Sequence, residues 1–545
     1  MNHALPLAQF SAMVKAQPNK AYLHQPIDRK LIIYTWSQVD EMARRMAQAL
    51  LNLGFVKGDR IGILSKNCAE WFISDLSIMM AGMISVPIYP TANRGTISYV
   101  LDKSDCKAVF VGKLDNLMES DAGIPSKIKK ITLPYPTISG QHTWNDLLKT
   151  EPLEIINSAN ADETMSIAFT SGSTGKPKGV VLSYENLAAS SNTAVDLMGV
   201  RNKDHVMSYL PLAHITERSL IENVSFYSGC KVFFVESLDT FIDDVKTAEP
   251  HLFISVPRLW NKFQIEILTK IPDKKLQKLL KMPVINKFIA KKIRKGLGLN
   301  KARCFGSGTA PISLSTLEWY NRLGMPISEG WGMTETSGLS CSNFPFNTKM
   351  LGTIGKACAC VEMKIDDNKE ILIRGPAVFK EYYLQPEATK ASFTDGWFHT
   401  GDMGSATSDG VYRIIGRVKE QFKTAKGKYV APAPIENLLA QNNEIEQVCV
   451  MGSGRKQPIA LLVLAQQQNA ASESATKLLE GILNEANSQL ESHQRLDHLV
   501  VLNEEWTIEN GLLTPTMKIK RSEIESTFNH YLEKELLEKI VWQNE

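Results

Sequence analysis

The N-terminal part of the chain alternates between two hydrophobic periods. Apolar positions in residues 36–53 recur at helical spacing, and Gly54 ends the run. Residues 59–64 and 107–111 are short apolar runs typical of strands, whereas residues 70–83 predict a second helix. This alternation of strand and helix predicts parallel α/β layers, in which ligands bind beyond the carboxyl ends of the strands.

The pattern changes in the second half of the chain. Residues 361–365 and 370–374 are short apolar strands joined by a polar turn, which predicts a hairpin in a small β subdomain. Beyond Gly416, residues 448–451 and 459–464 predict strands, and a helix is expected around positions 475 to 490. We therefore expect a small α+β domain at the C-terminus.

The length and composition fit a multidomain globular protein. At 545 residues the chain is too long for one hydrophobic core. Its apolar share of 43% and charged share of 22% are ordinary for a soluble protein. The predicted fold class is α/β, with a large N-terminal domain of layered α/β subdomains, the small β subdomain and the α+β C-terminal domain.

The cysteines and the apolar runs favour a cytoplasmic protein. The eight cysteines are scattered, and only Cys358 and Cys360 lie close together, with no histidine nearby, so a metal site is not expected. Scattered cysteines fit a reducing compartment. The N-terminus lacks a basic start and a sustained apolar core, and the longest nearly apolar run, residues 76–89, is too short to span a bilayer.

The net charge of +3 is unevenly distributed. Residues 262–303 carry thirteen Lys and Arg against Glu266 and Asp273, a net charge of +11. Apolar residues recur there at helical spacing on both sides of Pro283. Two interpretations stay open at this point: a basic amphipathic element that lies peripherally on a membrane, or surface helices packed on the core with a solvated lysine face.

Residues 170–180, TSGSTGKPKGV, form the most distinctive loop of the chain. They combine three glycines, four hydroxyl side chains and two lysines directly after the apolar run 165–169. Such a loop can wrap phosphate oxygens with backbone N–H groups, hydroxyls and positive charge. It is not a Walker A sequence, because only two residues separate Gly172 from Gly175. It indicates a nucleotide triphosphate site, the alternative being an ordinary turn.

Four further motifs follow this loop along the chain. They are LPLAHITER at 210–218, EGWGMTE at 329–335, DGWFHTGD at 395–402 followed by GRVKE at 416–420, and TPTMKIKR at 514–521. In sequence and order the five segments resemble the acyl-adenylate-forming superfamily of acyl-CoA synthetases, firefly luciferases and adenylation domains of peptide synthetases. The resemblance spans about residues 30–525. The LPLAH-x-x-ER form and the TPT-x-K-x-KR ending are most similar to long-chain fatty acyl-CoA synthetases.

The resemblance implies an ATP-dependent fatty acyl-CoA synthetase for medium to long chains. The fatty acid carboxylate would attack the α-phosphate of ATP and release pyrophosphate, and the CoA thiol would then displace AMP. Both steps pass through crowded negative charge, so catalysis rests on positioning and electrostatic stabilisation. The implied ligands are a fatty acid, ATP, CoA and Mg²⁺. No nucleic-acid partner is expected, and the oligomeric state is left open.

The resemblance also implies a division of the chain at a hinge. Residues 1–418 would form the adenylate-forming domain with the ATP and acyl sites, and residues 419–545 a mobile C-terminal domain that carries Lys518. Lys419 matches the hinge position. Rotation about it would withdraw Lys518 before the thiol enters, and residues 425–430 would then line the thiol tunnel.

The phosphates and the metal would be held by two of the motifs. Glu335 would bind Mg²⁺ and Thr334 would contact the α-phosphate, although Thr-Glu also suits a helix N-terminus. Lys178 matches the lysine of the family loop, whereas Lys176 is at a variable position. The loop residues implied to bind the β- and γ-phosphates are Thr170, Ser171, Gly172, Ser173, Thr174, Gly175 and Lys178.

The nucleoside would be held by the third and fourth motifs. Trp331 would stack on adenine where most relatives carry tyrosine, the alternative being a core tryptophan. Asp402 would accept hydrogen bonds from both ribose hydroxyls, and Arg417 would donate to the ribose or phosphate. The glycine-rich segments implied to line the adenine and acyl sites contain Gly308, Thr309, Gly330 and Gly332.

Two further residues are implied to lie at the reacting atoms. Lys518 would bridge the carboxylate and the α-phosphate oxygens during adenylation, because the K-I-x-R register selects it over Lys520. His214 would form a wall of the site and not act as a general base, since the substrate carboxylate is already ionised. From composition alone, His214 could equally be a structural histidine, and the basic residues around Lys518 a solvated cluster.

Two departures from the family pattern and two rival functions remain. Tyr184 stands where many relatives carry histidine, and Arg218 where some bacterial relatives carry an aromatic gate on the acyl tunnel. One rival is a fatty acyl-AMP ligase that passes the acyl group to a carrier-protein phosphopantetheine. The other is a non-catalytic, lipid-binding relative, against which intact Lys518, Glu335 and Asp402 argue.

Overall fold

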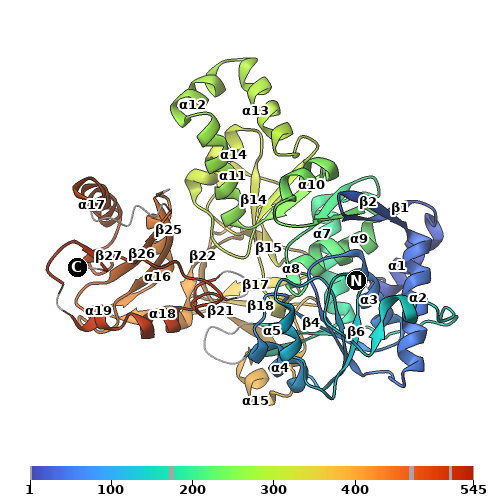
Figure 1. The fold of residues 1–545 in the computed structure, drawn as a ribbon. Coiled ribbons are helices and arrows are strands. Elements are labelled where there is room, and N and C mark those ends of the chain that lie inside the picture. The colour runs from blue at the N-terminus through green and yellow to red at the C-terminus, as the bar shows by residue number, and fades with distance from the viewer. Residues whose placement is uncertain are drawn as a thin grey trace.

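The computed structural model describes residues 3–170, 177–442, 444–465, 472–514, 518–534 and 536–543. Within these residues the strands form five sheets, of eight, ten, four, four and two strands. Figure 1 shows the C-terminal sheet and its helices to one side of the remaining molecule, and a pair of helices that projects from the top. The predicted class, α/β with a separate C-terminal domain, is confirmed.

An eight-stranded sheet forms the centre of the N-terminal part. Six parallel strands run in the order β8-β4-β3-β5-β6-β7, and β9 and β19 continue it antiparallel at one edge. The carboxyl ends of the parallel strands therefore share one edge, where β8 ends at Thr170. The bounds are β3 (Arg60–Leu64), β4 (Ile84–Ile88), β5 (Cys106–Val111), β6 (Lys129–Thr132), β7 (His142–Thr143), β8 (Thr164–Thr170), β9 (Lys178–Ser183) and β19 (Glu381–Tyr382).

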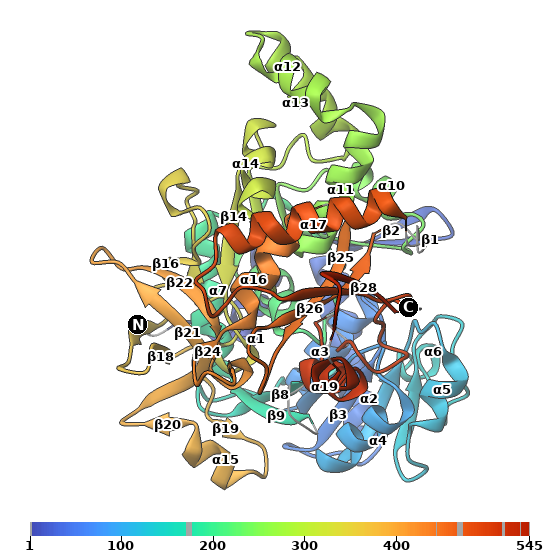
Figure 2. The same ribbon diagram turned by 90° about the vertical axis from the view of Figure 1, so that its left-hand side faces the viewer.

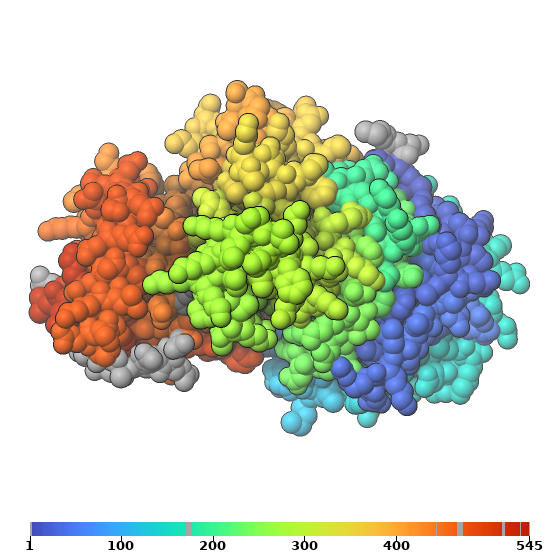
Figure 3. All heavy atoms as spheres, turned by 90° about the horizontal axis from the view of Figure 1, so that it is seen from above, coloured from blue at the N-terminus to red at the C-terminus, as the bar shows by residue number. Residues whose placement is uncertain are grey.

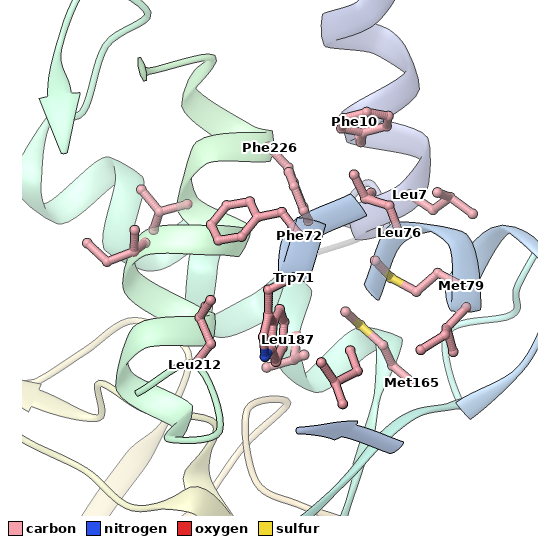
Figure 4. Packing of buried hydrophobic residues seen from close by; sticks show 14 of the residues in the cluster. Leu7, Phe10, Trp71, Phe72, Leu76, Met79, Met165, Leu187, Leu212 and Phe226 are labelled. Carbon is pink, nitrogen blue, oxygen red and sulfur yellow. The ribbon is translucent and has the colours of Figure 1, made fainter. Parts of the chain in front are cut away.

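Helices cover both faces of this sheet because its side chains alternate between two cores. Ile61 and Ile63 belong to the larger core, and the neighbouring Leu64 to the smaller. Figure 4 shows the larger core, where Trp71 and Phe72 lie among side chains from several elements. The helices of this part are α1 (Pro6–Ala16), α2 (Trp36–Asn52), α3 (Ala69–Met80), α4 (Arg94–Lys103), α5 (Leu117–Ala122), α6 (Trp144–Leu147), α7 (Tyr184–Met198), α8 (Ile215–Glu217), a π-helix η1 (Arg218–Asn223) and α9 (Val224–Ser228).

Local signals set the ends of the predicted helices. Helix α2 begins at a capping box, in which Thr35 accepts from the Gln38 backbone and its own N–H donates to the Gln38 side chain over 2.8 Å. Helix α3 ends at Met80, three residues before the predicted end, because Gly82 takes a φ of 73° and turns the chain. The predicted strands at 59–64 and 107–111 are β3 and β5.

A ten-stranded sheet adjoins the first. Strands β12, β13 and β14 are parallel, and the sheet continues through antiparallel strands in the order β15-β16-β22-β21-β18-β17, with β20 paired to β21. The predicted hairpin is β17–β18. The bounds are β12 (Leu252–Ser255), β13 (Cys304–Ser307), β14 (Ile327–Trp331), β15 (Cys341–Ser342), β16 (Gly355–Ala357), β17 (Glu362–Ile365), β18 (Glu370–Arg374), β20 (Phe393–Thr394), β21 (Trp397–Ala406) and β22 (Val411–Arg417).

The small β subdomain is thus continuous with the parallel strands, because β15 pairs with the open edge of β14. The chain leaves the ten-stranded sheet at β19, where Tyr382 pairs with Val180 of β9. This return places residues from both sheets side by side at the edge where β8 ends. A four-stranded sheet has the order β10 (His205–Ser208), β11 (Lys231–Phe234), β1 (Ala21–Ile27) and β2 (Lys30–Thr35). Strands β1 and β2 precede the eight-stranded sheet in sequence, and β10 and β11 lie between β9 and β12.

A separate core holds the helices around β12, β13 and β14. Trp260 and Tyr320 form its centre, and the Tyr320 hydroxyl donates to the Trp260 carbonyl over 2.5 Å. Leu276 joins this core from the first helix of the projecting pair. The helices are α10 (Phe241–Ala248), α11 (Pro257–Lys270), α12 (Asp273–Lys281), α13 (Ile285–Gly296) and α14 (Leu314–Arg322), followed later by η2 (Thr334–Thr336), η3 (Thr348–Met350) and α15 (Pro386–Ala391).

The C-terminal part has its own sheet with a core on each face. Strands β25 and β26 are antiparallel, and β27 and β28 add parallel to β26. The predicted strands at 448–451 and 459–464 and the predicted helix, α17, are present. The elements are η4 (Val418–Glu420), β23 (Phe422–Lys423), β24 (Tyr429–Val430), α16 (Pro432–Leu439), β25 (Ile445–Met451), β26 (Ile459–Leu464), α17 (Glu473–Ser488), β27 (His498–Val501), α18 (Arg521–Thr527), α19 (His530–Glu533) and β28 (Ile540–Trp542).

Candidate active site

Glu335 lies in a buried contact between the two large sheets. It follows β14 in the short helix η2 and is 8% exposed. The Tyr382 hydroxyl of β19 donates to its Oε1 over 2.9 Å, and burial raises the pKa of the Glu335 carboxyl. The Lys178 ammonium of β9 lies 4.6 Å from the centre of the Tyr382 ring. The predicted metal ligand and the predicted loop lysine are therefore joined through one tyrosine.

The phosphate loop begins and ends at paired residues. Thr170 and Lys178 face each other across β8 and β9, and the Thr170 hydroxyl donates to the Lys178 carbonyl over 3.5 Å. The loop therefore starts at the carboxyl edge of the parallel strands and returns beside Glu335. The loop residues Ser171, Gly172, Ser173, Thr174 and Gly175 lie outside the described residues.

The glycines of the third motif allow a tight backbone approach. A Cβ on Gly332 would lie 1.5 Å from the Gly338 carbonyl oxygen, so a side chain cannot be accommodated without moving the backbone. A Cβ on Gly308 would lie 3.1 Å from the Gly330 carbonyl oxygen, and the next residue, Thr309, has a φ of 68°. The two predicted glycine-rich segments thus lie against each other at the ends of β13 and β14.

Asp402 is held by donors on both carboxylate oxygens. The Trp331 indole donates to Oδ2 over 2.9 Å, and the Arg417 guanidinium donates to Oδ1 over 2.6 Å. Asp402 and Arg417 are paired across β21 and β22, and Asp402 is 6% exposed. Trp331 is half-buried, so it is neither a fully enclosed core tryptophan nor a free surface ring. The adenine stacking and ribose binding expected of Trp331 and Asp402 stay predictions.

His214 is fixed at the start of α8. Its Nδ1 accepts a hydrogen bond from the Thr216 backbone over 3.2 Å. Burial, together with the positive charge of Lys518, lowers the pKa of His214 to about 4. The ring is therefore neutral at physiological pH and a weak base, and its role as a wall of the site stays a prediction.

Asn67 and Glu217 brace the loop that leads to His214. The Asn67 amide donates to the Leu210 carbonyl over 2.7 Å and accepts from the Leu212 backbone over 3.1 Å. Glu217 Oε1 accepts from the Tyr209 backbone over 2.9 Å, and burial raises the pKa of Glu217 to about 8. These contacts hold the second motif against the end of β3.

Lys518 reaches the site from the C-terminal domain. Its backbone N–H donates to the Thr514 hydroxyl over 3.1 Å, which fixes the turn that presents it. The residue keeps an exposed surface, yet the surrounding protein withdraws its ammonium from water and lowers the pKa of Lys518, against the opposing effect of the Asp402 and Glu335 carboxylates. Lys518 thus lies in the electrostatic field of residues from the N-terminal domain.

The basic residues that follow Lys518 have a different role. The Arg521 guanidinium donates to both Glu436 oxygens, over 2.7 and 2.8 Å, and is 8% exposed. Its Nε lies 3.7 Å from Glu420, next to the predicted hinge residue Lys419, which is exposed in η4. Arg521 is therefore a structural residue of the C-terminal core, and the KIKR run is not a uniform solvated face.

Arg218, which stands where some relatives carry an aromatic residue, is buried in an ionic cluster. It is 1% exposed, and its guanidinium donates to Asp75 over 2.6 Å and to Glu222 over 3.4 Å. A third bond, to the Ser166 hydroxyl over 2.6 Å, reaches β8. Burial and the neighbouring Asp75 raise the pKa of Glu222 well above its usual range. The cluster ties the His214 segment to the strand that ends at the phosphate loop.

Several of these contacts could not be found from the motifs. Tyr382 and Asn67 lie outside every motif segment, and Glu420 lies within GRVKE but had no predicted role. The one local signal is the aromatic pair Tyr382 and Tyr383 after a hairpin, which is equally typical of core packing. Within the described residues, no group of three His, Cys, Asp or Glu side chains could hold a metal ion by itself.

Comparison with known proteins shows the family of the chain. Residues 10–383 match the model of the AMP-binding enzyme family, and residues 419–536 match that of the AMP-binding enzyme C-terminal domain. The chain belongs to the AMP-binding enzyme family. It is 31% identical to the long-chain-fatty-acid–CoA ligase 5 of Mus musculus, over 93% of this chain and 85% of that protein. It is 29% identical to the long-chain-fatty-acid–CoA ligase FadD15 of Mycobacterium bovis, over 92% of this chain and 93% of that protein.

Solved structures share the fold. An anthranilate CoA ligase, AuaEII, in complex with anthranoyl-AMP superposes with a TM-score of 0.81 at 20% identity, covering 98% of each chain. The o-succinylbenzoate CoA synthetase MenE of Bacillus subtilis, in complex with ATP and a magnesium ion, superposes with a TM-score of 0.74 at 22% identity. The match covers 95% of this chain and 99% of that chain.

Proposed function

We propose that this chain is an ATP-dependent fatty acyl-CoA synthetase of the long-chain type. It converts a fatty acid, ATP and CoA into acyl-CoA, AMP and pyrophosphate through an acyl adenylate. The relatives named as long-chain-fatty-acid–CoA ligases support the activity. The observation that supports the proposal is the electrostatic interaction of Lys518 with Asp402, Glu335 and His214, because one cation from a second domain acts on the residues predicted to surround the nucleotide.

Each residue of the site takes a role in adenylation that follows from its charge. Lys518 neutralises the carboxylate and the α-phosphate oxygens as they approach each other, and Arg417 donates to Asp402 and orients it toward the ribose. Neutral His214 borders the reacting carboxylate without adding charge. Gly332 allows the close backbone approach to Gly338 that fixes the segment carrying Trp331, and the loop from Thr170 to Lys178 binds the β- and γ-phosphates.

The residues fit a magnesium ion that arrives with the nucleotide. Magnesium prefers few protein carboxylates and keeps water and phosphate oxygens as its other ligands. Glu335 offers one carboxylate whose Oε1 is already oriented by Tyr382, and burial raises its pKa, an effect that a bound cation would oppose. When bound, the ion would neutralise phosphate charge and orient the departing pyrophosphate. Glu335→Gln is expected to raise the magnesium concentration required for half-maximal rate, with Glu318→Gln on α14 as the control.

The domain division at residues 418 and 419 belongs to the same proposal. The C-terminal domain contacts the N-terminal domain through exposed pairs, such as Arg258 with Glu446 over 3.2 Å and with Glu505 over 3.3 Å. Exposed ion pairs contribute little free energy, about 0–1 kcal/mol, and break readily. This supports rotation about Lys419 after adenylation.

The eight thiols support a cytoplasmic location. All eight cysteines are free and buried, as fits a reducing compartment. None of the helices in the described residues is long and apolar enough to cross a membrane. We infer peripheral membrane contact through residues 262–303.

Fatty-acid-dependent release of pyrophosphate from ATP, over a series of chain lengths with and without CoA, tests the activity. Turnover that requires CoA and peaks at one chain length is the expected result. A single burst of pyrophosphate that CoA does not change would contradict the synthetase and point to a carrier-protein acceptor. Fatty-acid binding without ATP consumption would point to the non-catalytic relative.

A further inference from the structure

The turn between helices α12 and α13 exposes a compact group of apolar side chains. Val284 is 80% exposed and Phe288 67% exposed. With Met282 at 46% and Ile285 at 37%, they place four of the large exposed apolar residues of the described chain within seven positions. We call Met282, Val284, Ile285 and Phe288 the apolar tip. Exposed apolar groups of this kind mark a contact surface when they cluster, whereas single ones need no explanation.

The apolar tip is distinct from the face that holds the helix pair on the protein. Leu276 of α12 is buried in the core around Trp260, and Ile289 and Ile293 of α13 pack against the same core. Phe288 is adjacent to Ile289 in sequence, yet it points away from that core, as its exposure shows. The helix pair therefore has one apolar face that packs against the core and one apolar end that is exposed to solvent.

The backbone at the tip is unfavourable for its sequence. Val284 has a φ of 71°, a left-handed value that β-branched residues rarely adopt. Glycine or asparagine would occupy such a turn at lower cost. The valine is almost fully exposed, so packing within the protein does not account for it.

The same helices carry a dense positive charge without matching carboxylates. The exposed lysines on α12, α13 and the end of α11 are Lys270, Lys274, Lys275, Lys278, Lys281, Lys287, Lys291, Lys292 and Lys295. Among the described residues, none of these nine ammonium groups lies within ion-pair distance of a carboxylate. Asp273, the acidic residue of the pair, accepts hydrogen bonds from Trp319 over 3.2 Å and Gln277 over 3.0 Å. The positive charge of these nine lysines therefore faces solvent without a carboxylate of the described residues to neutralise it.

The tip and the lysines occupy the outermost part of the molecule. Figures 1 and 2, related by a quarter turn, both show α12 and α13 projecting beyond the remaining elements. Seen from above in Figure 3, the yellow-green atoms of this region lie in front of the body of the protein. A flat surface could approach this end without contacting the C-terminal domain first.

We propose that the apolar tip inserts into the interfacial region of an anionic lipid bilayer while the surrounding lysines bind its phosphate groups. Amphipathic elements of this composition lie in the headgroup region with their apolar residues below it, and each lysine near an anionic surface contributes independently. Four side chains form far too small a surface for a stable protein interface, which needs about 800 Å² per partner. A nucleic acid would pair with the lysines and leave the tip exposed. The proposal does not depend on the catalytic activity.

Co-sedimentation of the full-length protein with vesicles tests the proposal directly. The vesicles are phosphatidylcholine with or without phosphatidylglycerol, and no ATP or fatty acid is added. We expect binding to the mixed vesicles that weakens as salt rises, and much weaker binding to phosphatidylcholine alone. Equal binding to both compositions, or to neither, would overturn the proposal.

Two variants separate the tip from the charge. Val284→Ser with Phe288→Ser is expected to lower affinity for the mixed vesicles by about tenfold to a hundredfold, since a buried Phe or Val contributes about 1.5–3 kcal/mol. Met118→Ser with Leu238→Ser, which removes residues that are 86% and 88% exposed elsewhere, is the matched control and should bind like the parent. A tip variant that binds like its control would overturn insertion.

Charge reversal of Lys274, Lys275, Lys278 and Lys281 to Glu is expected to lower affinity by about a hundredfold or more. Reversal of the exposed lysines Lys15, Lys20, Lys30 and Lys349 is its control. Thermal midpoints and pyrophosphate release with a water-soluble fatty acid should match the parent in all four variants, because none touches a core or the candidate site. If both reversals weaken binding equally, net charge alone explains the binding and the proposed site is wrong.

Discussion

The Trp331 indole N–H donates to Asp402 Oδ2 over 2.9 Å, although the two residues belong to different motifs 71 positions apart. The same carboxylate accepts from Arg417 on its other oxygen. Trp331 therefore orients the carboxylate predicted to bind the ribose, in addition to its predicted stacking on adenine. Phenylalanine can preserve the aromatic ring but not this bond.

Trp331→Phe is expected to raise the KM for ATP about tenfold or more, because a hydrogen bond to a charged group contributes about 1.5–3 kcal/mol. The rate at saturating ATP should change less. Trp397→Phe is the control, since Trp397 lies on the same strand as Asp402 but stacks with Lys364 and Arg374. An unchanged KM in Trp331→Phe would show that the ring alone matters.

Lys518→Ala is expected to lower the rate of adenylate formation by at least about a hundredfold, the order found when one preorganised charge-stabilising group is removed. Thioester formation from supplied acyl-AMP should be retained, because Lys518 leaves the site before that step. Stopped-flow or quenched assays of each half-reaction measure the two rates. Lys520→Ala should change neither, and an equal loss of both half-reactions in Lys518→Ala would contradict the assigned role.

Arg218→Ala is expected to destabilise the N-terminal domain by about 3–5 kcal/mol, because it leaves the buried Asp75 carboxylate without its cation. The shift in the urea midpoint of the intrinsic fluorescence transition measures this. Arg374→Ala breaks the exposed pair with Glu362 and should cost about 0–1 kcal/mol. Similar midpoints for the two variants would show that the buried cluster adds nothing to stability.

Glu217→Gln is expected to flatten the pH dependence of stability. The folded pKa of Glu217 is about 8 against an ordinary value of 4.5, so the folded protein binds a proton that the unfolded chain releases. Stability from this group is present below pH 4.5 and is lost as pH rises toward 8, at most about 4–5 kcal/mol. Glutamine keeps the acceptor for Tyr209 without an ionisable proton.

Thermal midpoints from pH 5 to pH 9 test this effect. The parent should lose stability relative to Glu217→Gln as pH rises, and Glu185→Gln, on an exposed position of α7, should follow the parent. Parallel curves for the parent and Glu217→Gln would show that the carboxyl does not change its protonation within the folded protein.

Local elements were predictable where a periodic pattern and an end signal coincided. Helix α2, hairpin β17–β18 and the pair α12 and α13 all follow from apolar spacing with Gly54, the polar turn or Pro283 at a boundary. Strand β19 carries no such signal, because two residues have no period. It forms because the edge of β9 offers unpaired backbone groups to Tyr382 and Glu381.

The structure bears on the two open interpretations of the basic segment by showing which of its apolar side chains pack on the core. Apolar spacing in 276–293 cannot distinguish a side chain packed on the core from one aimed at a second surface, since both recur at the same period. In the structure Leu276 and Ile289 face the core, and Phe288 faces outward. Packing on the core thus accounts for Leu276 and Ile289, and the membrane interpretation stays a proposal for the outward-facing residues.

The sequence by itself determined the residue types and spacings of the five motifs, and with them the family and the kind of chemistry. Those are local properties, fixed by neighbours along the chain. Only the tertiary structure decided which charges meet: Arg218 with Asp75, 143 positions away, Tyr382 with Glu335, and Lys518 with residues of the other domain. The physical reason is that burial and electrostatic interaction depend on distance in space, which the packing of sheets and domains sets and the order of residues does not.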